Sequence, residues 1–131
     1  MIDYSKMITP ADKFEQAKQA KLSQINSDFN AAASALTSGY PEAERMTWAT
    51  QQAEVMAWNA DNNIPTPYLD GLAEARGISP EEMRQKTLEQ TQLFLAASQS
   101  LVGKRQRLRD AAYAATTKED LEAIIWGDLH R

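Results

Sequence analysis

Apolar residues recur at alternating steps of three and four along two long stretches of this chain. In the first stretch, about residues 11–37, they are Leu22, Ile25, Phe29, Ala32 and Leu36. In the second, about residues 80–115, Phe94, Leu101 and Leu108 repeat every seven residues, flanked by Leu88, Leu95 and Val102. This spacing is typical of helices that pack through a narrow apolar seam. It predicts two long, antiparallel, coiled-coil-like helices.

Proline residues predict where helices begin. Four of the five prolines stand at positions that suit a helix start, namely Pro10, Pro41, Pro67 and Pro80. Proline is favoured at the first helical position because its φ is already helical and its missing N–H would have had no intrahelical partner. A fifth start is expected at Thr116 or Thr117, opening a short last helix that runs through Trp126 and ends at Gly127.

The start of the second long helix carries the fullest set of signals. Ser79 can cap the helix, and Glu82 can reach back to complete a capping box. Ile78 can pack on Met83 as a hydrophobic staple. At the end of the first helix, Gly39 is expected to terminate it by adopting a positive φ.

Together these signals predict an all-α fold. We expect an elongated bundle of about five helices, two long and three shorter, forming a single domain over residues 11–131. Residues 1–10 differ, since Ile2, Tyr4 and Ile8 are spaced by even steps. Even spacing favours extended chain, so this segment is expected to be an arm laid on the bundle or on a partner.

Composition excludes several classes of protein. The 131 residues include 43% hydrophobic and 24% charged residues, which is ordinary for one globular domain. A net charge of −4 argues against a general nucleic-acid binder, which needs clustered Lys and Arg. No apolar run approaches the roughly 18 residues of a membrane span, so no membrane partner is expected. The absence of cysteine excludes disulfides and thiolate metal sites.

Candidates for catalysis are few. His130 is the single histidine, so neither a buried catalytic triad nor paired histidine metal ligands can be assembled. The carboxylate pairs Glu81–Glu82 and Glu119–Asp120 fall in the first turns of expected helices, where capping and the helix dipole explain them. No phosphate-binding glycine loop is present. We therefore expect no enzymatic activity, no cofactor and no metal.

Aromatic and basic residues offer candidates for binding. Trp48 and Trp58 share one face of the helix that begins at Pro41, and burial in the core is the default for both. Trp126 follows Ile124 and Ile125, an apolar surplus that suits either a docking surface or a tucked-in last helix. A basic cluster is formed by Lys104, Arg105, Arg107 and Arg109. Because these four spread around the helix, a solvated surface is expected, with an acidic patch on a partner as the alternative.

The order of short motifs along the chain resembles a known family. The motifs are Gly39-Tyr40-Pro41, Glu44-Arg45, Thr47-Trp48, Gln51, Glu54, Ala57-Trp58, Thr66-Pro67 and Ala75-Arg76-Gly77. Asp12-Lys13, Gly103, Arg105-Gln106 and Ala115-Thr116-Thr117 continue the pattern, so that it covers most of residues 7–125. This order resembles the helical domain at the C-terminal end of tailed-phage tail-fibre assembly proteins and some tail-fibre proteins.

The resemblance implies a non-enzymatic assembly chaperone that binds a phage tail-fibre protein in the host cytoplasm during assembly. The family's β-rich N-terminal region does not precede the helical module here, which leaves a second interpretation open: a structural adaptor retained on the virion tail. The long seams also suit a homo-oligomer. From residue chemistry, the candidate partner-binding residues are Ile2, Tyr4, Tyr40, Ile124, Ile125, Trp126 and Leu129.

Overall fold

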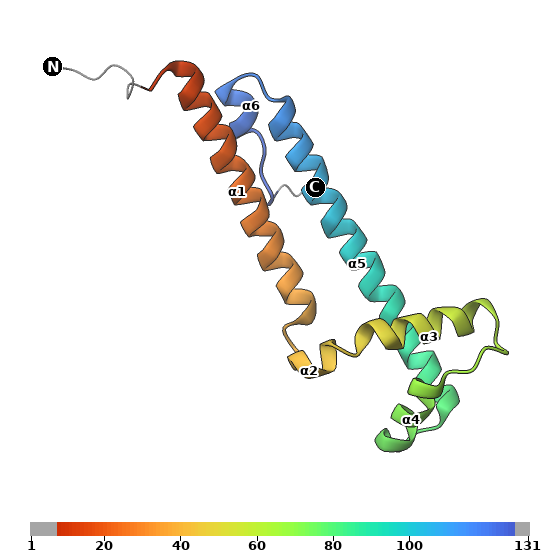
Figure 1. The fold of residues 1–131 in the computed structure, drawn as a ribbon. Helices are drawn as coiled ribbons and strands as arrows, with labels where there is room; N and C mark the ends of the chain where they lie inside the picture. Colours follow the sequence, from red (N-terminus) through yellow and green to blue (C-terminus); the bar gives the residue numbers. More distant parts are fainter. Residues whose placement is uncertain (1–7, 128–131) are drawn as a thin grey trace. The chain divides into compact units, whose positions relative to one another are not determined.

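The computed structural model describes residues 8–127 and is all-α, as predicted. Figure 1 labels the helices along the chain. Their bounds are α1 Pro10–Thr37, α2 Glu42–Arg45, α3 Trp48–Ala60, α4 Pro67–Arg76, α5 Pro80–Ala114 and α6 Lys118–Glu122. The described residues contain no strand. Within this range, no helix combines the length and the apolar character that a bilayer crossing requires.

The chain divides into two compact units. Unit 1 consists of Met1–Ser34 with Ser100–Arg131, and unit 2 is Ala35–Gln99. The long helices α1 and α5 each contribute residues to both units, whereas α3 and α4 belong to unit 2 and α6 to unit 1. The predicted boundary between an arm at residues 1–10 and a single domain stays a prediction, because residues 1–7 lie outside the described part.

Unit 1 has a small apolar core where α6 meets the two long helices. The buried residues of this core are Ile25, Ala112, Ala115, Leu121 and Ile124, with Phe14, Ala17, Leu22 and Leu108 partly buried around them. Leu22 and Ile25 of the predicted seam on α1 therefore face apolar neighbours. After α6 the chain stays against α1, where the Lys21 Nζ donates a hydrogen bond of 2.8 Å to the Ile124 carbonyl.

All five predicted helix starts are confirmed, but the helix after Pro41 is interrupted. It forms the short α2 and then, after Met46 and Thr47, the longer α3. The Thr47 hydroxyl donates to the Glu44 carbonyl at 2.7 Å. A side chain that bonds a nearby carbonyl competes with the regular backbone ladder, and this bond accompanies the break.

The predicted end of the last helix is wrong, and so is the positive φ predicted at Gly39. The last helix ends at Glu122 instead of continuing through Trp126 to Gly127. Beyond it the chain leaves the helical path, which buries Ile124 in the core and sets the Trp126 ring edge-on to Phe29 at 6.4 Å. The first helix ends at Thr37, just before Gly39 as predicted, but the described glycine with a positive φ is Gly77, at 84°.

The predicted capping signals are borne out in part. Ser79 Oγ accepts a hydrogen bond of 3.0 Å from the Glu82 N–H, and Ile78 packs in the same apolar cluster as Met83. A complete capping box forms instead at α6, between Thr117 and Asp120. Hydrogen bonds from the backbone N–H of Thr116 and from Thr117 hold the pKa of Asp120 below its ordinary value.

The coiled-coil packing of the two long helices stays a prediction. In unit 1, Asn26 of α1 accepts a hydrogen bond of 2.9 Å from Arg105 Nε of α5. Trp126 contacts both helices, since its ring lies edge-on to Phe29 and its centroid is 4.5 Å from Lys104 Nζ. Apolar contact between α1 and α5 in this unit therefore also involves the segment that follows α6.

A candidate binding groove

The core of unit 2 fixes α3, α4 and the first turns of α5 together. Its buried residues are Val55, Trp58, Leu69, Ala73 and Met83, with Leu72, Ile78 and Leu88 packed against them. Val55 and Leu69 are the largest fully buried side chains of the described chain. Trp58 is only 7% exposed, so its predicted place in the core is confirmed.

A carboxylate from α3 caps the start of α4. Thr66 precedes Pro67, but its side chain makes no capping hydrogen bond. Instead the two oxygens of Glu54 accept from the N–H groups of Tyr68 at 2.8 Å and Leu69 at 2.9 Å. A negative charge at a helix N-terminus is favourable both as an acceptor and through the helix dipole. This contact fixes the geometry of the α3–α4 corner.

Arg84 joins α5 to the same corner. Its guanidinium lies 3.1 Å from Asp70 and 3.1 Å from Glu81, and its carbon Cζ lies 5.4 Å from the centroid of the Trp58 ring. The Gln85 amide and Arg84 both donate hydrogen bonds to Glu81, and these bonds hold the pKa of Glu81 below its ordinary value. Arg84 is thus occupied by contacts within unit 2.

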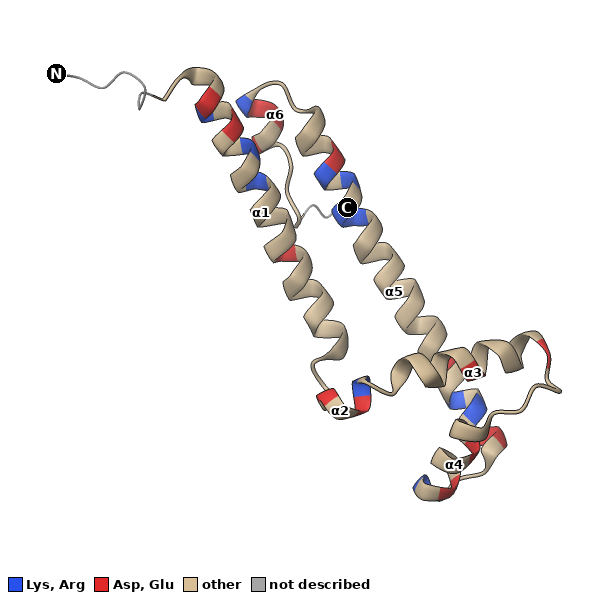
Figure 2. Cartoon of the chain, viewed as in Figure 1, with Lys and Arg blue, Asp and Glu red and all other residues tan. Residues whose placement is uncertain are grey.

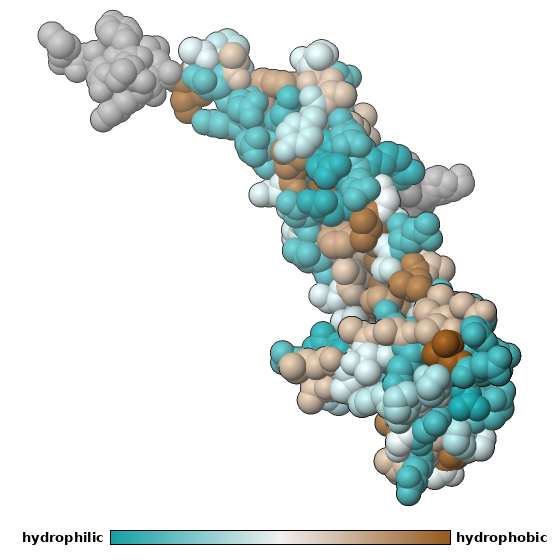
Figure 3. All heavy atoms as spheres, turned by 45° about the vertical axis from the view of Figure 1, so that its right-hand side comes forward, coloured by the Kyte–Doolittle hydropathy of each residue, from teal (hydrophilic) through white to brown (hydrophobic). Residues whose placement is uncertain are grey.

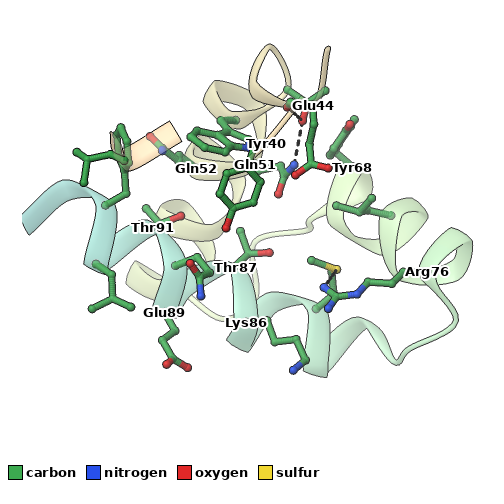
Figure 4. Close-up of a pocket in the computed structure, with 18 of the residues that line it drawn as sticks. Tyr40, Glu44, Gln51, Gln52, Tyr68, Arg76, Lys86, Thr87, Glu89 and Thr91 are labelled. Carbon is green, nitrogen blue, oxygen red and sulfur yellow. Dashed lines mark hydrogen bonds between the residues drawn. The ribbon is translucent and has the colours of Figure 1, made fainter. Parts of the chain in front are cut away.

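Beside this core lies a groove of about 1150 Å³, which we call the Trp48 groove. It is lined by Leu36, Tyr40, Glu44, Thr47, Trp48, Gln51, Gln52, Tyr68, Leu72, Arg76, Met83, Lys86, Thr87, Glu89, Gln90, Thr91, Leu93, Phe94 and Ala97. All of these residues belong to unit 2. Figure 4 shows side chains from α3 and from the turn after α1 facing those of α5 across it.

Aromatic rings form one end of the Trp48 groove. The Trp48 ring makes edge-to-face contacts with Tyr40 at 5.1 Å and with Phe94 at 5.8 Å between ring centroids. Tyr40 is 43% exposed, and Leu93 nearby on α5 is 59% exposed. Trp48 is half-buried, so the prediction that it lies in the core is not confirmed. The break between α2 and α3 places Trp48 at a helix start, where one side of its ring stays open to the groove.

A buried hydroxyl without a partner lies in the same groove. Thr87 is 7% exposed, and its Oγ1 has no hydrogen-bond partner. Thr91, one turn along α5, is 4% exposed and also lines the groove. In Figure 4 the Tyr40 hydroxyl points towards Thr87. An unpaired buried hydroxyl costs about 1–3 kcal/mol, so its presence in a groove calls for an explanation.

Two of the segments that line the groove, those that hold Trp48 and Phe94, carry no charge. Residues 46–53 and residues 90–103 contain neither acidic nor basic side chains, and the middle of α5 is accordingly tan in Figure 2. The charged lining residues are Glu44, Arg76, Lys86 and Glu89, which include both signs. The part of the groove lined by residues 46–53 and 90–97 is therefore suited to an uncharged group.

The candidate residues named from sequence are distributed over the chain. Tyr40 lines the Trp48 groove. Ile124 is 7% exposed in the core of unit 1, Ile125 is 55% exposed, and Trp126 is half-buried against Phe29. Ile2, Tyr4 and Leu129 lie outside the described residues. The structure thus brings Ile124, Ile125 and Trp126 together in unit 1 and places Tyr40 in unit 2.

The spacing of two threonines on α5 is a sequence feature that relates to the groove. Thr87 and Thr91 precede Phe94 by seven and three residues, so these three lie on one face of α5. Threonine is a polar residue at two positions of a seam that otherwise holds apolar side chains. Polar positions within an apolar helix face are a signal for a site.

The basic cluster of α5 is partly engaged in unit 1. Lys104 lies over Trp126, and Arg105 Cζ is 6.0 Å from the Phe29 ring centroid. Arg109 pairs with its neighbour Asp110 at 3.2 Å. Figure 2 shows these basic residues on the C-terminal part of α5. Among residues 8–127, no group of three or more histidine or acidic side chains is placed to hold a metal ion.

Comparisons with known proteins give no assignment. The chain matches no family model, no curated protein and no solved structure. The tail-fibre resemblance of its motif order therefore stays a prediction.

Proposed function

We propose that this chain is a non-enzymatic protein-binding module that helps a phage tail-fibre protein to fold or attach in the host cytoplasm. The observation that carries the binding role is the Trp48 groove, where the exposed Tyr40 and the half-buried Trp48 and Phe94 lie in the same lining as buried hydroxyls. Apolar surface with aromatic residues and few charges is typical of the centre of protein interfaces. Figure 3 shows apolar residues exposed among hydrophilic ones on the face that it draws.

The tail-fibre partner is supported by the ordered motifs, and the structure gives several of them a physical role. Glu54 caps α4, Trp58 packs in the core of unit 2, and Gly77 ends α4 with a positive φ. Trp48 and Gln51 line the groove. The motif order is therefore compatible with one folded unit that presents a binding surface.

The architecture behind this proposal includes the antiparallel pairing of α1 and α5. The contact between Asn26 and Arg105 in unit 1 supports that pairing, as does the approach of Lys18 to the Tyr113 carbonyl at 3.5 Å. As the α1 residue moves from 18 to 26, its α5 partner moves back from 113 to 105, as an antiparallel pair requires. A homo-oligomer remains part of the proposal, since seams of this kind also pair between chains.

Co-expression tests the function. A phage tail-fibre protein is expressed with and without this chain, and the yield of soluble trimeric fibre is measured. A fibre that becomes soluble only with the chain supports the proposal, and equal yields contradict it. Mass spectrometry of purified virions then separates the two roles, because an assembly chaperone is absent from virions and a structural adaptor is present in fixed ratio.

A further inference from the structure

We infer that the Trp48 groove binds an extended, uncharged polypeptide segment of the partner, with its backbone bonded to Thr87 and Thr91. This inference rests on the proposed protein-binding function and names the chemistry of the segment that is bound. Three features of the groove carry it: the spacing of its hydroxyls, its unpaired polar atom and the composition of its aromatic end.

The spacing of the two threonines matches an extended chain. Residues four apart on a helix are separated by about 6.0 Å along its axis, because each residue rises about 1.5 Å. In a β-strand, backbone groups that point to one edge recur every two residues, about 6.6–6.8 Å apart. A strand lying along α5 can therefore reach both Thr87 and Thr91 with successive groups of one edge.

The unpaired hydroxyl of Thr87 needs a partner of the kind that a peptide backbone supplies. A threonine hydroxyl both donates and accepts, so it can bond either an N–H or a carbonyl group. Thr87 is more than nine-tenths buried and its Oγ1 has no partner within the described chain. The exposed Tyr40 ring, whose hydroxyl points towards Thr87 in Figure 4, is the side chain that moves aside when the segment enters.

The aromatic end selects the side chains of the segment. Trp48 and Phe94 present ring surface from residues 46–53 and 90–103, which contain no charged side chain, and Tyr40 packs on Trp48. An apolar side chain fits there, whereas a charged one would lose water without gaining an opposite charge. Alternate side chains of a strand point to the same side, so apolar residues are expected at every second position.

The size of the groove favours a chain over a small molecule. Its volume of about 1150 Å³ exceeds the usual upper range of small-ligand pockets, about 1000 Å³. Charged residues of both signs, including Lys86 and Glu89, line the groove away from the rings. They can contact the ends of a longer segment in water.

A displayed library of random twelve-residue peptides without cysteine tests the inference on the full chain. Wild-type protein is expected to enrich peptides with apolar residues at alternate positions. Thr87→Val is expected to bind these peptides about tenfold more weakly, the loss of about 1.4 kcal/mol that one well-placed hydrogen bond represents. Thr66→Val is the matched control, because Thr66 is buried in the same unit but does not line the groove. It should bind the peptides like wild type.

Three outcomes overturn the inference: no peptide is enriched, the enriched peptides bind Thr87→Val as tightly as wild type, or they share helical spacing instead of alternation. A second copy of the chain bound in the groove also overturns the inference. Light scattering would then show a molar mass that rises with protein concentration for wild type but not for Trp48→Ala. The fibre experiment distinguishes failure of the proposed function from failure of this inference. If the proposed function is wrong, the wild-type chain leaves the fibre insoluble, whether or not peptides bind the groove.

Discussion

Replacing Thr87 by valine should stabilise the folded protein. Valine keeps the shape of threonine and exchanges the unpaired hydroxyl for a methyl group, while the helix propensities of the two residues are nearly equal. Removing a buried, unpaired hydroxyl recovers part of a penalty of about 1–3 kcal/mol, and burying one methyl group adds about 0.8 kcal/mol. Thr87 lies within α5 and is 7% exposed, so the new methyl group would be buried. We therefore expect the free energy of unfolding to rise by about 1–2 kcal/mol.

The same substitution at Thr66 should have the opposite sign or no effect. Thr66 is 2% exposed, and its hydroxyl donates a hydrogen bond of 2.9 Å to Asp70. Losing that bond costs about 0.5–1.5 kcal/mol, which the new methyl group offsets by about 0.8 kcal/mol. The free energy of unfolding should therefore stay the same or fall by up to about 1 kcal/mol. The comparison tests whether the lost hydroxyl has a partner, because Thr66 bonds Asp70 and Arg84, whereas Thr87 Oγ1 bonds nothing in the described chain.

Urea unfolding measures both variants. Tryptophan fluorescence and far-ultraviolet circular dichroism should be recorded together, because coincident transitions justify a two-state free energy. If Thr87→Val lowers the free energy of unfolding, or changes it as Thr66→Val does, the Thr87 hydroxyl is bonded in solution. The physical argument for a vacant hydrogen-bond position in the groove would then fail.

Three other predictions concern substitutions at helix ends and inside a helix. Glu54→Gln should lower the free energy of unfolding by about 1–2 kcal/mol in urea, because a neutral amide offers one acceptor oxygen to the two N–H groups at the start of α4; an unchanged value would contradict this capping role. Gly77→Ala should lower the thermal midpoint through a cost of about 1–2 kcal/mol at φ 84°, whereas Gly103→Ala, which meets no atom within 4 Å inside α5, should raise it through a gain of about 1 kcal/mol; equal shifts would refute the assignment. Because the folded pKa of Asp120 lies below its ordinary value of 3.8, the stabilising effect of its carboxylate is present above that pH and is lost as the pH falls through the folded pKa. The difference in urea midpoint between wild type and Asp120→Asn should therefore shrink on acidification. A difference that stays constant from pH 7 to about pH 2 would count against this prediction.

Helix starts could be predicted from sequence because their causes are local. A proline at the first helical position, or a threonine followed by an acidic residue as in Thr117–Asp120, acts within one turn of the chain. The cap that Glu54 places on α4 comes from another helix, so no local pattern announces it. The end of α6 at Glu122 likewise depends on where Ile124 and Trp126 find apolar neighbours in unit 1.

The groove could be predicted only in part. The sequence indicates Tyr40 as a candidate binding residue, and Tyr40 lines the groove, but it predicts Trp48 in the core. Its half-buried position follows from the break after α2, where Thr47 bonds the Glu44 carbonyl. The spacing of Thr87 from Phe94 places both on one face of α5, but only the three-dimensional contacts show that the Thr87 hydroxyl lacks a partner and that the Thr66 hydroxyl has one.

Hydrogen exchange of the chain in complex with the tail-fibre protein tests the central claim most directly. Binding at the Trp48 groove predicts slower exchange of backbone amides in residues 40–52 and 87–97, with little change in α6 and its neighbours in unit 1. Slowing confined to residues 118–127, or no slowing in any part of the chain when fibre is present, would contradict the groove as the working surface.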